Sequence, residues 1–172
     1  MTYWDARAEA ERAAAEPLWN SYAQRFYDVR PASYLNGQWE ARNWLNVPGP
    51  FYGAFTDTCG AGPPAAPLNV SCDDDGTEFV WRQPRCPAEV RAVLGAAYQE
   101  PFDGYNWDGD DRWTPELVME WWDGRARVDE WLSTADFGQS ELASKTAGEY
   151  RRYLAGELRD DLLRYAEWLS QT

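Results

Sequence analysis

The chain has 172 residues and a formal net charge of −13, from 29 acidic and 16 basic side chains, and it contains no histidine. The excess of negative charge argues against direct binding to nucleic acid, since contacts to phosphates need clustered Lys and Arg. The missing histidine excludes Ser-His-Asp and Cys-His catalysis, and also the zinc and iron sites that depend on imidazole ligands.

The length suits a single globular domain spanning residues 1–172, and the 44% of apolar residues is enough to form a core. The sequence shows no signal-peptide pattern at its start and no apolar run of membrane-spanning length. Three cysteines, Cys59, Cys72 and Cys86, form no C-x-x-C pair, which argues against a disulfide framework, a zinc ribbon or an iron–sulfur cluster. We therefore expect a cytoplasmic protein with no membrane contact and no cofactor.

The first predicted element is a helix over residues 4–29. Alanine is abundant in its first half, and large apolar residues follow with helical spacing as far as Phe26. Pro17 is expected to kink this helix or to begin a second one, because proline lacks a backbone donor. Residues 31–46 contain an Asn-Gly pair that fits a hairpin turn, although we favour a loop followed by a short helix.

A loop is predicted over residues 47–67, which hold five prolines and four glycines. Its three large aromatic rings would not be left in water, so we expect an ordered segment over the core and consider it as one wall of a site. Residues 68–83 are predicted to form an antiparallel hairpin around an Asp-Asp-Gly turn. Further strands are expected from the 30–60 region, because a lone hairpin is only marginally stable.

The second half of the chain is predicted to be mainly helical. Pro87 begins one helix, Thr114 and Pro115 form the N-cap and first residue of another, and residues 140–169 have the period of one long amphipathic helix. These elements predict an α+β fold. We expect a mostly helical single domain with a small antiparallel β-sheet that contains the 68–83 hairpin.

The segment 100–123 combines six aromatic and eight acidic residues with a single arginine. Flat aromatic faces beside carboxylates attract cations, and Trp and Tyr dominate the energetics of protein interfaces. This segment, with one tyrosine from the 47–67 loop, supplies the candidate binding residues. They are Tyr52, Tyr105, Trp107, Asp108, Asp110, Asp111, Trp113 and Glu116.

Three functions fit these residues. The first is an acidic binding protein that occludes a basic protein partner, as an inhibitor or immunity-type factor does, with the carboxylates steering association and Trp107 and Trp113 as anchors. In size and charge the chain resembles bacterial toxin-immunity proteins and nucleic-acid mimics. The second is a binding or self-resistance protein for a cationic metabolite or antibiotic, held in a Trp/Tyr/Asp pocket. The third is a small enzyme that uses two carboxylates as acid and base.

Two further sites are rejected on their residue patterns. Residues 106–117 place oxygens at alternate positions as an EF-hand loop does, but the sixth residue is Asp111 instead of Gly and the twelfth is Leu117 instead of Glu. Cys59 lies near Asp57, whose charge should raise the pKa of the thiol, and no histidine can serve as its base. Neither an EF-hand nor a cysteine nucleophile is therefore expected.

Overall fold

The computed structural model describes residues 3–20, 24–138 and 140–172. It is mostly helical with short antiparallel strands, which confirms the expected α+β fold. The α-helices are α1 (Ala6–Ala13), α2 (Gly62–Ala65), α3 (Pro87–Gln99), α4 (Pro115–Asp123), α5 (Ala126–Thr134), α6 (Glu141–Ala155) and α7 (Leu158–Leu169). The 3-10 helices are η1 (Pro31–Ser33), η2 (Trp39–Ala41) and η3 (Asp108–Asp111), and the strands are β1 (Leu18–Asn20), β2 (Arg25–Tyr27), β3 (Tyr52–Gly53), β4 (Val70–Cys72), β5 (Glu78–Val80) and β6 (Tyr105–Asn106).

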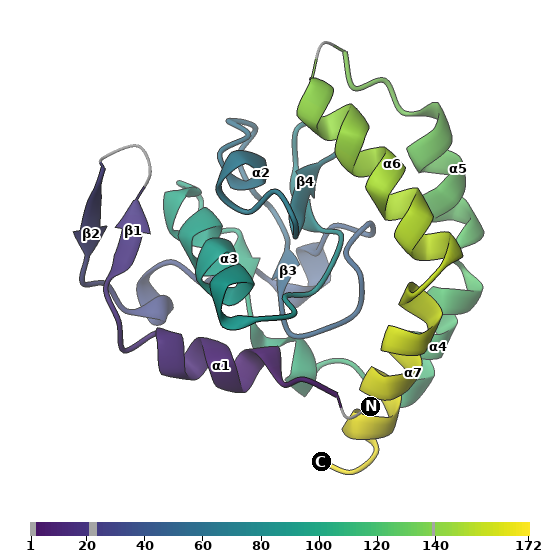
Figure 1. Cartoon of the computed structure of the whole chain (residues 1–172), viewed down its shortest axis with the longest axis horizontal. Coiled ribbons are helices and arrows are strands. Elements are labelled where there is room, and N and C mark those ends of the chain that lie inside the picture. Colours follow the sequence, from purple (N-terminus) through teal and green to yellow (C-terminus); the bar gives the residue numbers. More distant parts are fainter. Residues whose placement is uncertain (1–2, 21–23, 139) are drawn as a thin grey trace.

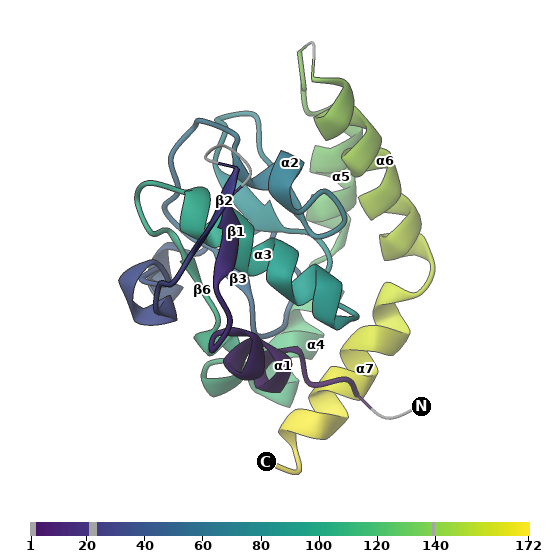
Figure 2. The same cartoon turned by 60° about the vertical axis from the view of Figure 1, so that its left-hand side comes forward.

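The molecule has two sides, each with its own hydrophobic core cluster. Helices α4 to α7 form one side, α1, α3 and the β1–β2 pair form the other, and β3 and β4 lie between them (Figure 1). The first cluster is built around α1 and α3 and includes Phe51 and Tyr105. The second is built around α4 to α7 and includes Phe79 and Trp81. The turned view shows α6 and α7 lying along one edge of the molecule (Figure 2).

The strands pair as β1 with β2, β3 with β6, and β4 with β5, all antiparallel. The last pair confirms the predicted hairpin, with Val70 opposite Val80. The 30–60 region supplies a further strand, β3, as expected, but in the described chain β3 pairs with β6 and does not extend the β4–β5 hairpin.

The helix predicted over residues 4–29 is wrong beyond Ala13. Helix α1 ends there, and β1 and β2 form an antiparallel pair in which Trp19 lies opposite Phe26, with ring centroids 5.0 Å apart. The aromatic residues therefore face each other across two strands and do not form a helical stripe. Residues 21–23, which belong to the predicted range, lie outside the described part of the chain.

The C-terminal half follows the prediction more closely. Pro87 begins α3, and the Thr114 side chain accepts a hydrogen bond from the N–H of Leu117 at the start of α4, as an N-cap does. The single helix expected over 140–169 is instead two helices, α6 and α7, because the backbone leaves helical geometry at Gly156, where φ is −116° and ψ is −99°. The apolar period continues across this break, and this period outweighed Gly156, a residue type that often ends a helix.

The 47–67 loop is ordered and largely buried, and the rings of Phe51 and Tyr52 are enclosed as expected, but the expectation is wrong for Phe55, which is 72% exposed and stacks on Phe102. The buried Asn46 side chain supports it by donating hydrogen bonds to the carbonyls of Asn43 and Gly53 and accepting them from the N–H groups of Gly53 and Val80. Close backbone packing supports it further. A Cβ atom at Gly53 would overlap the carbonyl of Glu78, and one at Gly109 would overlap the carbonyl of Gly49.

Two carboxylates are completely enclosed beside this loop. Glu78 is 0% exposed and Glu100 is 1% exposed. The Glu78 carboxylate accepts hydrogen bonds from the Gly62 N–H at 2.8 Å and the Tyr105 hydroxyl at 2.6 Å. Glu100 accepts from backbone N–H groups, including that of Asp57 at 2.7 Å. Burial is the main reason that the pKa of Glu78 is raised to about 7.

Replacing Glu78 by Gln should remove a defined pH dependence of stability. The carboxyl titrates near its ordinary pKa of 4.5 when unfolded and at about 7 when folded, so the native state binds the proton more tightly. The free energy of unfolding of the wild type therefore falls by about 3 kcal/mol as the pH rises through this window. Urea unfolding between about pH 5 and about pH 8 should show this change in the difference between wild type and Glu78→Gln.

The exposed substitution Glu130→Gln is the control, and its difference from wild type should stay constant over the same range. A Glu78→Gln difference that also stays constant would show that Glu78 remains ionised in the folded protein.

Candidate functional site

The two tyrosines proposed as walls of a binding site are part of the interior. Tyr52 is 2% exposed and Tyr105 is 0% exposed. The Tyr52 hydroxyl donates to the Asp108 carboxylate at 2.6 Å, and that of Tyr105 donates to Glu78. In this structure neither ring offers a face to a partner.

The two tryptophans proposed as anchors differ from each other. Trp107 is half-buried and packs against the first hydrophobic cluster. Trp113 is buried, and its ring meets that of Trp39 edge to face at 5.1 Å. The Arg42 guanidinium lies 3.9 Å from the Trp39 ring centroid and 5.6 Å from that of Trp113. The aromatic faces in this region therefore already hold a cation from the chain itself.

The three aspartates of η3 bind different parts of the molecule. Asp108 accepts from Tyr52 and pairs with Arg112 at 3.0 Å, and Asp111 pairs with Arg7 of α1 at 2.7 Å. Asp110 accepts from the Tyr165 hydroxyl of α7 at 2.7 Å. These contacts tie η3 to the core, to α1 and to α7.

Asp110 has an unusual environment. Its second carboxylate oxygen is buried and has no hydrogen-bond partner among the described residues. Burial is the main cause that raises the pKa of Asp110 to about 6, against the opposing effect of the Tyr165 hydrogen bond. A raised pKa suits acid–base catalysis, but the Asp110 carboxylate contacts Tyr165 and not a second carboxylate.

Glu116 is exposed and belongs to a set of like charges on α4. Glu116, Glu120 and Asp123 are spaced by four and three residues, so they share one helix face, and all three are exposed. Hydrogen bonds from its own backbone N–H and from Thr114 lower the pKa of Glu116. Among the described residues, no Arg or Lys lies within ion-pair distance of any of the three. We call this surface the acidic ridge.

Glu120 and Asp123 were not among the candidate site residues, although the signal for them was present in the sequence. Once Thr114 and Pro115 mark the start of a helix, the positions of Glu120 and Asp123 relative to Glu116 place them on one face.

Two cavities of appreciable volume lie elsewhere. One, of about 290 Å³, lies between the N-terminal segment, the 47–67 loop and helices α6 and α7. The other, of about 350 Å³, lies between β1–β2 and α3 and is lined by Trp19 and Phe26. None of the candidate residues proposed from the sequence lines either cavity. The sequence could not reveal them, since their walls come from segments far apart in the chain.

A metal site and a reactive cysteine each place requirements on the described part of the chain. No group of three or more Cys, Asp or Glu side chains there is arranged to hold a metal ion. Cys59 is exposed, and a hydrogen bond to Asp57 and the charge of that carboxylate raise the pKa of its thiol, as expected. The described helices include none with the length and apolar character that crossing a bilayer requires.

Comparisons of the chain with protein-family models, with curated proteins and with solved structures give no match. The functional argument therefore rests on the molecule's own surfaces and cavities.

Replacing Tyr165 by Phe tests whether Asp110 is an interior link. The change removes the hydroxyl donor and leaves the buried carboxylate without it, which should cost about 1–3 kcal/mol of unfolding free energy at about pH 8. The cost should shrink at about pH 5, where Asp110 is largely protonated because its folded pKa is about 6. Urea unfolding at both pH values measures this.

The double variant Tyr165→Phe with Asp110→Asn is the control, because it removes the charge and should lose the pH dependence. If Tyr165→Phe lowers the free energy of unfolding equally at the two pH values, Asp110 behaves as a solvated surface charge and the interior link is refuted.

Proposed function

We propose that the protein binds a basic protein partner through the acidic ridge of α4. The observation that carries this proposal is the set of three exposed carboxylates, Glu116, Glu120 and Asp123, on one helix face, none of which forms an ion pair within the described chain. A net charge of −13 strengthens the attraction of a basic partner over longer distances. By covering a basic surface of its partner, the protein would act as an inhibitor does.

Other helices of the same molecule pair their charges. In α1, Arg7 pairs with Glu11, and in α6, Lys145 pairs with Glu149. Such pairs at a spacing of four residues stabilise a helix, whereas like charges at the same spacing destabilise it by about 0.2–0.5 kcal/mol. The ridge therefore has an intrinsic cost that the neighbouring helices avoid, which supports a role outside the fold.

The ridge also carries apolar surface that a partner could bury. Leu117 is 40% exposed and lies next to Glu116 in α4. Trp122, one residue before Asp123, is half-buried beneath the Arg125 guanidinium at 4.1 Å. Apolar contact beside charged groups is the usual composition of a protein interface, with the charges setting the association rate.

Neutralising the ridge should slow association without unfolding the protein. The variant Glu116→Gln, Glu120→Gln, Asp123→Asn removes three negative charges and relieves their mutual repulsion, which opposes the loss of the hydrogen bonds that the ionised Glu116 accepts at the start of α4, so its stability should stay close to that of wild type. The partner would be captured at low salt from a lysate of the source organism, identified by mass spectrometry and purified. Its association rate with the variant should fall about tenfold at low ionic strength, with a shallower salt dependence.

The matched control changes the net charge equally at exposed carboxylates on other helices. In Glu130→Gln, Glu141→Gln, Asp160→Asn, none of the replaced side chains has an ion-pair partner in the described chain. This variant should associate nearly as fast as wild type. If both variants associate equally slowly, the effect comes from net charge alone and not from the ridge. Failure to capture any basic protein would refute the proposal, and so would an unaltered association rate for the ridge variant.

A further inference from the structure

The smaller cavity is a cleft where the two sides of the molecule meet. Trp4 packs against the first hydrophobic cluster, whereas Tyr3, Tyr153 and Tyr165 belong to or pack against the second, and all four line the cleft. Clefts between packed units are frequent ligand sites, and the volume of about 290 Å³ is near the lower end for small-molecule pockets. A ligand of one or two fused rings is the size that fits.

Most of the lining is aromatic or aliphatic. The Tyr3 ring lies 5.2 Å from that of Tyr165, and the Tyr153 ring lies edge to face with that of Trp81 at 6.4 Å. Pro48 and Leu162 complete the apolar walls. Such walls bind flat rings through burial and stacking.

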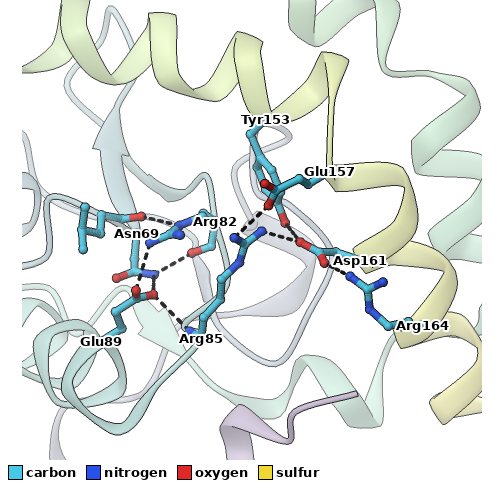
Figure 3. Close-up of polar contacts among 9 residues, drawn as sticks. Asn69, Arg82, Arg85, Glu89, Tyr153, Glu157, Asp161 and Arg164 are labelled. Carbon is cyan, nitrogen blue, oxygen red and sulfur yellow. Dashed lines mark hydrogen bonds and ion pairs between the residues drawn. The ribbon is translucent and has the colours of Figure 1, made fainter. Parts of the chain in front are cut away.

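The polar wall is fixed in advance by contacts outside the cleft. Figure 3 shows Glu89 of α3 holding the segment before that helix: its carboxylate accepts from Arg82 and from the backbone N–H of Arg85, both at 3.0 Å. Opposite, the Gln83 amide donates to the carbonyls of Val47 and Phe51, at 2.9 and 2.8 Å. The backbone at Arg85 and the carbonyls of Val47 and Phe51 are therefore held by contacts within the protein.

The charged groups at the cleft pair with one another. Arg85 reaches the junction of α6 and α7 and contacts Glu157 at 3.0 Å and Asp161 at 2.6 Å (Figure 3). Asp161 also accepts from the Tyr153 hydroxyl at 2.7 Å and pairs with Arg164. Two guanidinium groups thus meet two carboxylates, with no net charge. An anionic ligand would compete with Asp161 for the arginines, and a cationic one would compete with the arginines for the carboxylates.

Hydrogen-bonding capacity nevertheless remains. Arg164 bonds Asp161 through one of its terminal nitrogens, and Glu157 bonds Arg85 through one oxygen, so each keeps atoms with no hydrogen bond in the described chain. An uncharged group with both a donor and an acceptor, such as an amide, can use both.

From these observations we infer that the cleft is a binding site for an uncharged, flat aromatic compound with an amide-like polar edge. The rings lie between the tyrosines and Pro48, and the polar edge meets Arg164 and Glu157. The site is separate from the acidic ridge, so the ridge variant should bind such a compound as wild type does, and either proposal can fail alone.

Three indole derivatives with the same ring test the inference by ligand-observed and ¹H–¹⁵N NMR titration. Indole-3-acetamide is neutral, tryptamine is a cation and indole-3-acetate is an anion at neutral pH. The acetamide should bind saturably with a Kd of about 1 mM or below, as expected for its size. Each charged analogue should bind at least about threefold more weakly, because it must break an existing ion pair.

Two aromatic truncations locate the site. Tyr153→Ala removes a wall and should weaken acetamide binding about fivefold. Trp19→Ala removes a larger aromatic ring from the other cavity and should leave binding unchanged. In wild type, intermolecular NOEs should join the indole ring to the methyl groups of Leu162 and Val47, a readout that does not depend on how well Tyr153→Ala folds.

The inference is overturned if the acetamide shows no saturable binding, or if all three compounds bind equally well. NOEs to Phe26 together with weaker binding by Trp19→Ala would move the ligand to the other cavity and likewise refute it.

Discussion

The Asn46 side chain uses its full hydrogen-bonding capacity to hold the middle of the molecule together. It satisfies both backbone groups of Gly53 and also the N–H of Val80, thereby joining β3 to β5 where the described chain forms no continuous sheet. Buried backbone groups need such partners, and strands of two or three residues cannot supply them all. The Asn46 amide thus supplies the backbone hydrogen bonds that a neighbouring strand would otherwise supply.

The same principle extends through the 47–67 loop and to the cleft. Glu78, Glu100 and Gln83 each bond backbone groups of this loop, which lets it pass through the interior with only the short elements β3 and α2. Using carboxylates for this purpose has an electrostatic cost, visible in the raised pKa of Glu78. The benefit is rigidity, because Gln83 fixes Val47 and its neighbours as one wall of the cleft.

The sequence predicted those parts of the fold that local signals determine. Thr114 and Pro115 predict the start of α4, and the alternation of side chains around Phe79 predicts β5. The spacing of large apolar residues up to Phe26 wrongly predicted a helix. Residues seven apart, such as Trp19 and Phe26, can lie on one helix face or opposite each other across a hairpin, and tertiary packing decides between the two. The break between α6 and α7 has one local signal, Gly156, but the continuous apolar period around it favours a single helix.

The candidate site was harder to predict for a related reason. Tyr52, Tyr105 and Trp113 have the composition of a binding surface, yet aromatic rings serve a core equally well, and burial is not a local property. The position of Glu116 in the first turn of α4 could be predicted, because Thr114 and Pro115 are local signals for the start of that helix. The sequence could not predict the cleft, because the residues that line it become neighbours only when the chain folds. They include Trp4, Pro48, Arg85 and Tyr153.

The close backbone contacts at Gly53 and Gly109 determine where this protein can accept substitutions. Loops usually accept substitutions and insertions more readily than the elements they connect. Here a single added methyl group at either glycine would strike a carbonyl of a neighbouring segment, whereas the outer faces of α5 and α6 can change with little structural effect. Substitutions at these two glycines should therefore be tolerated less well than substitutions on the exposed faces of the helices.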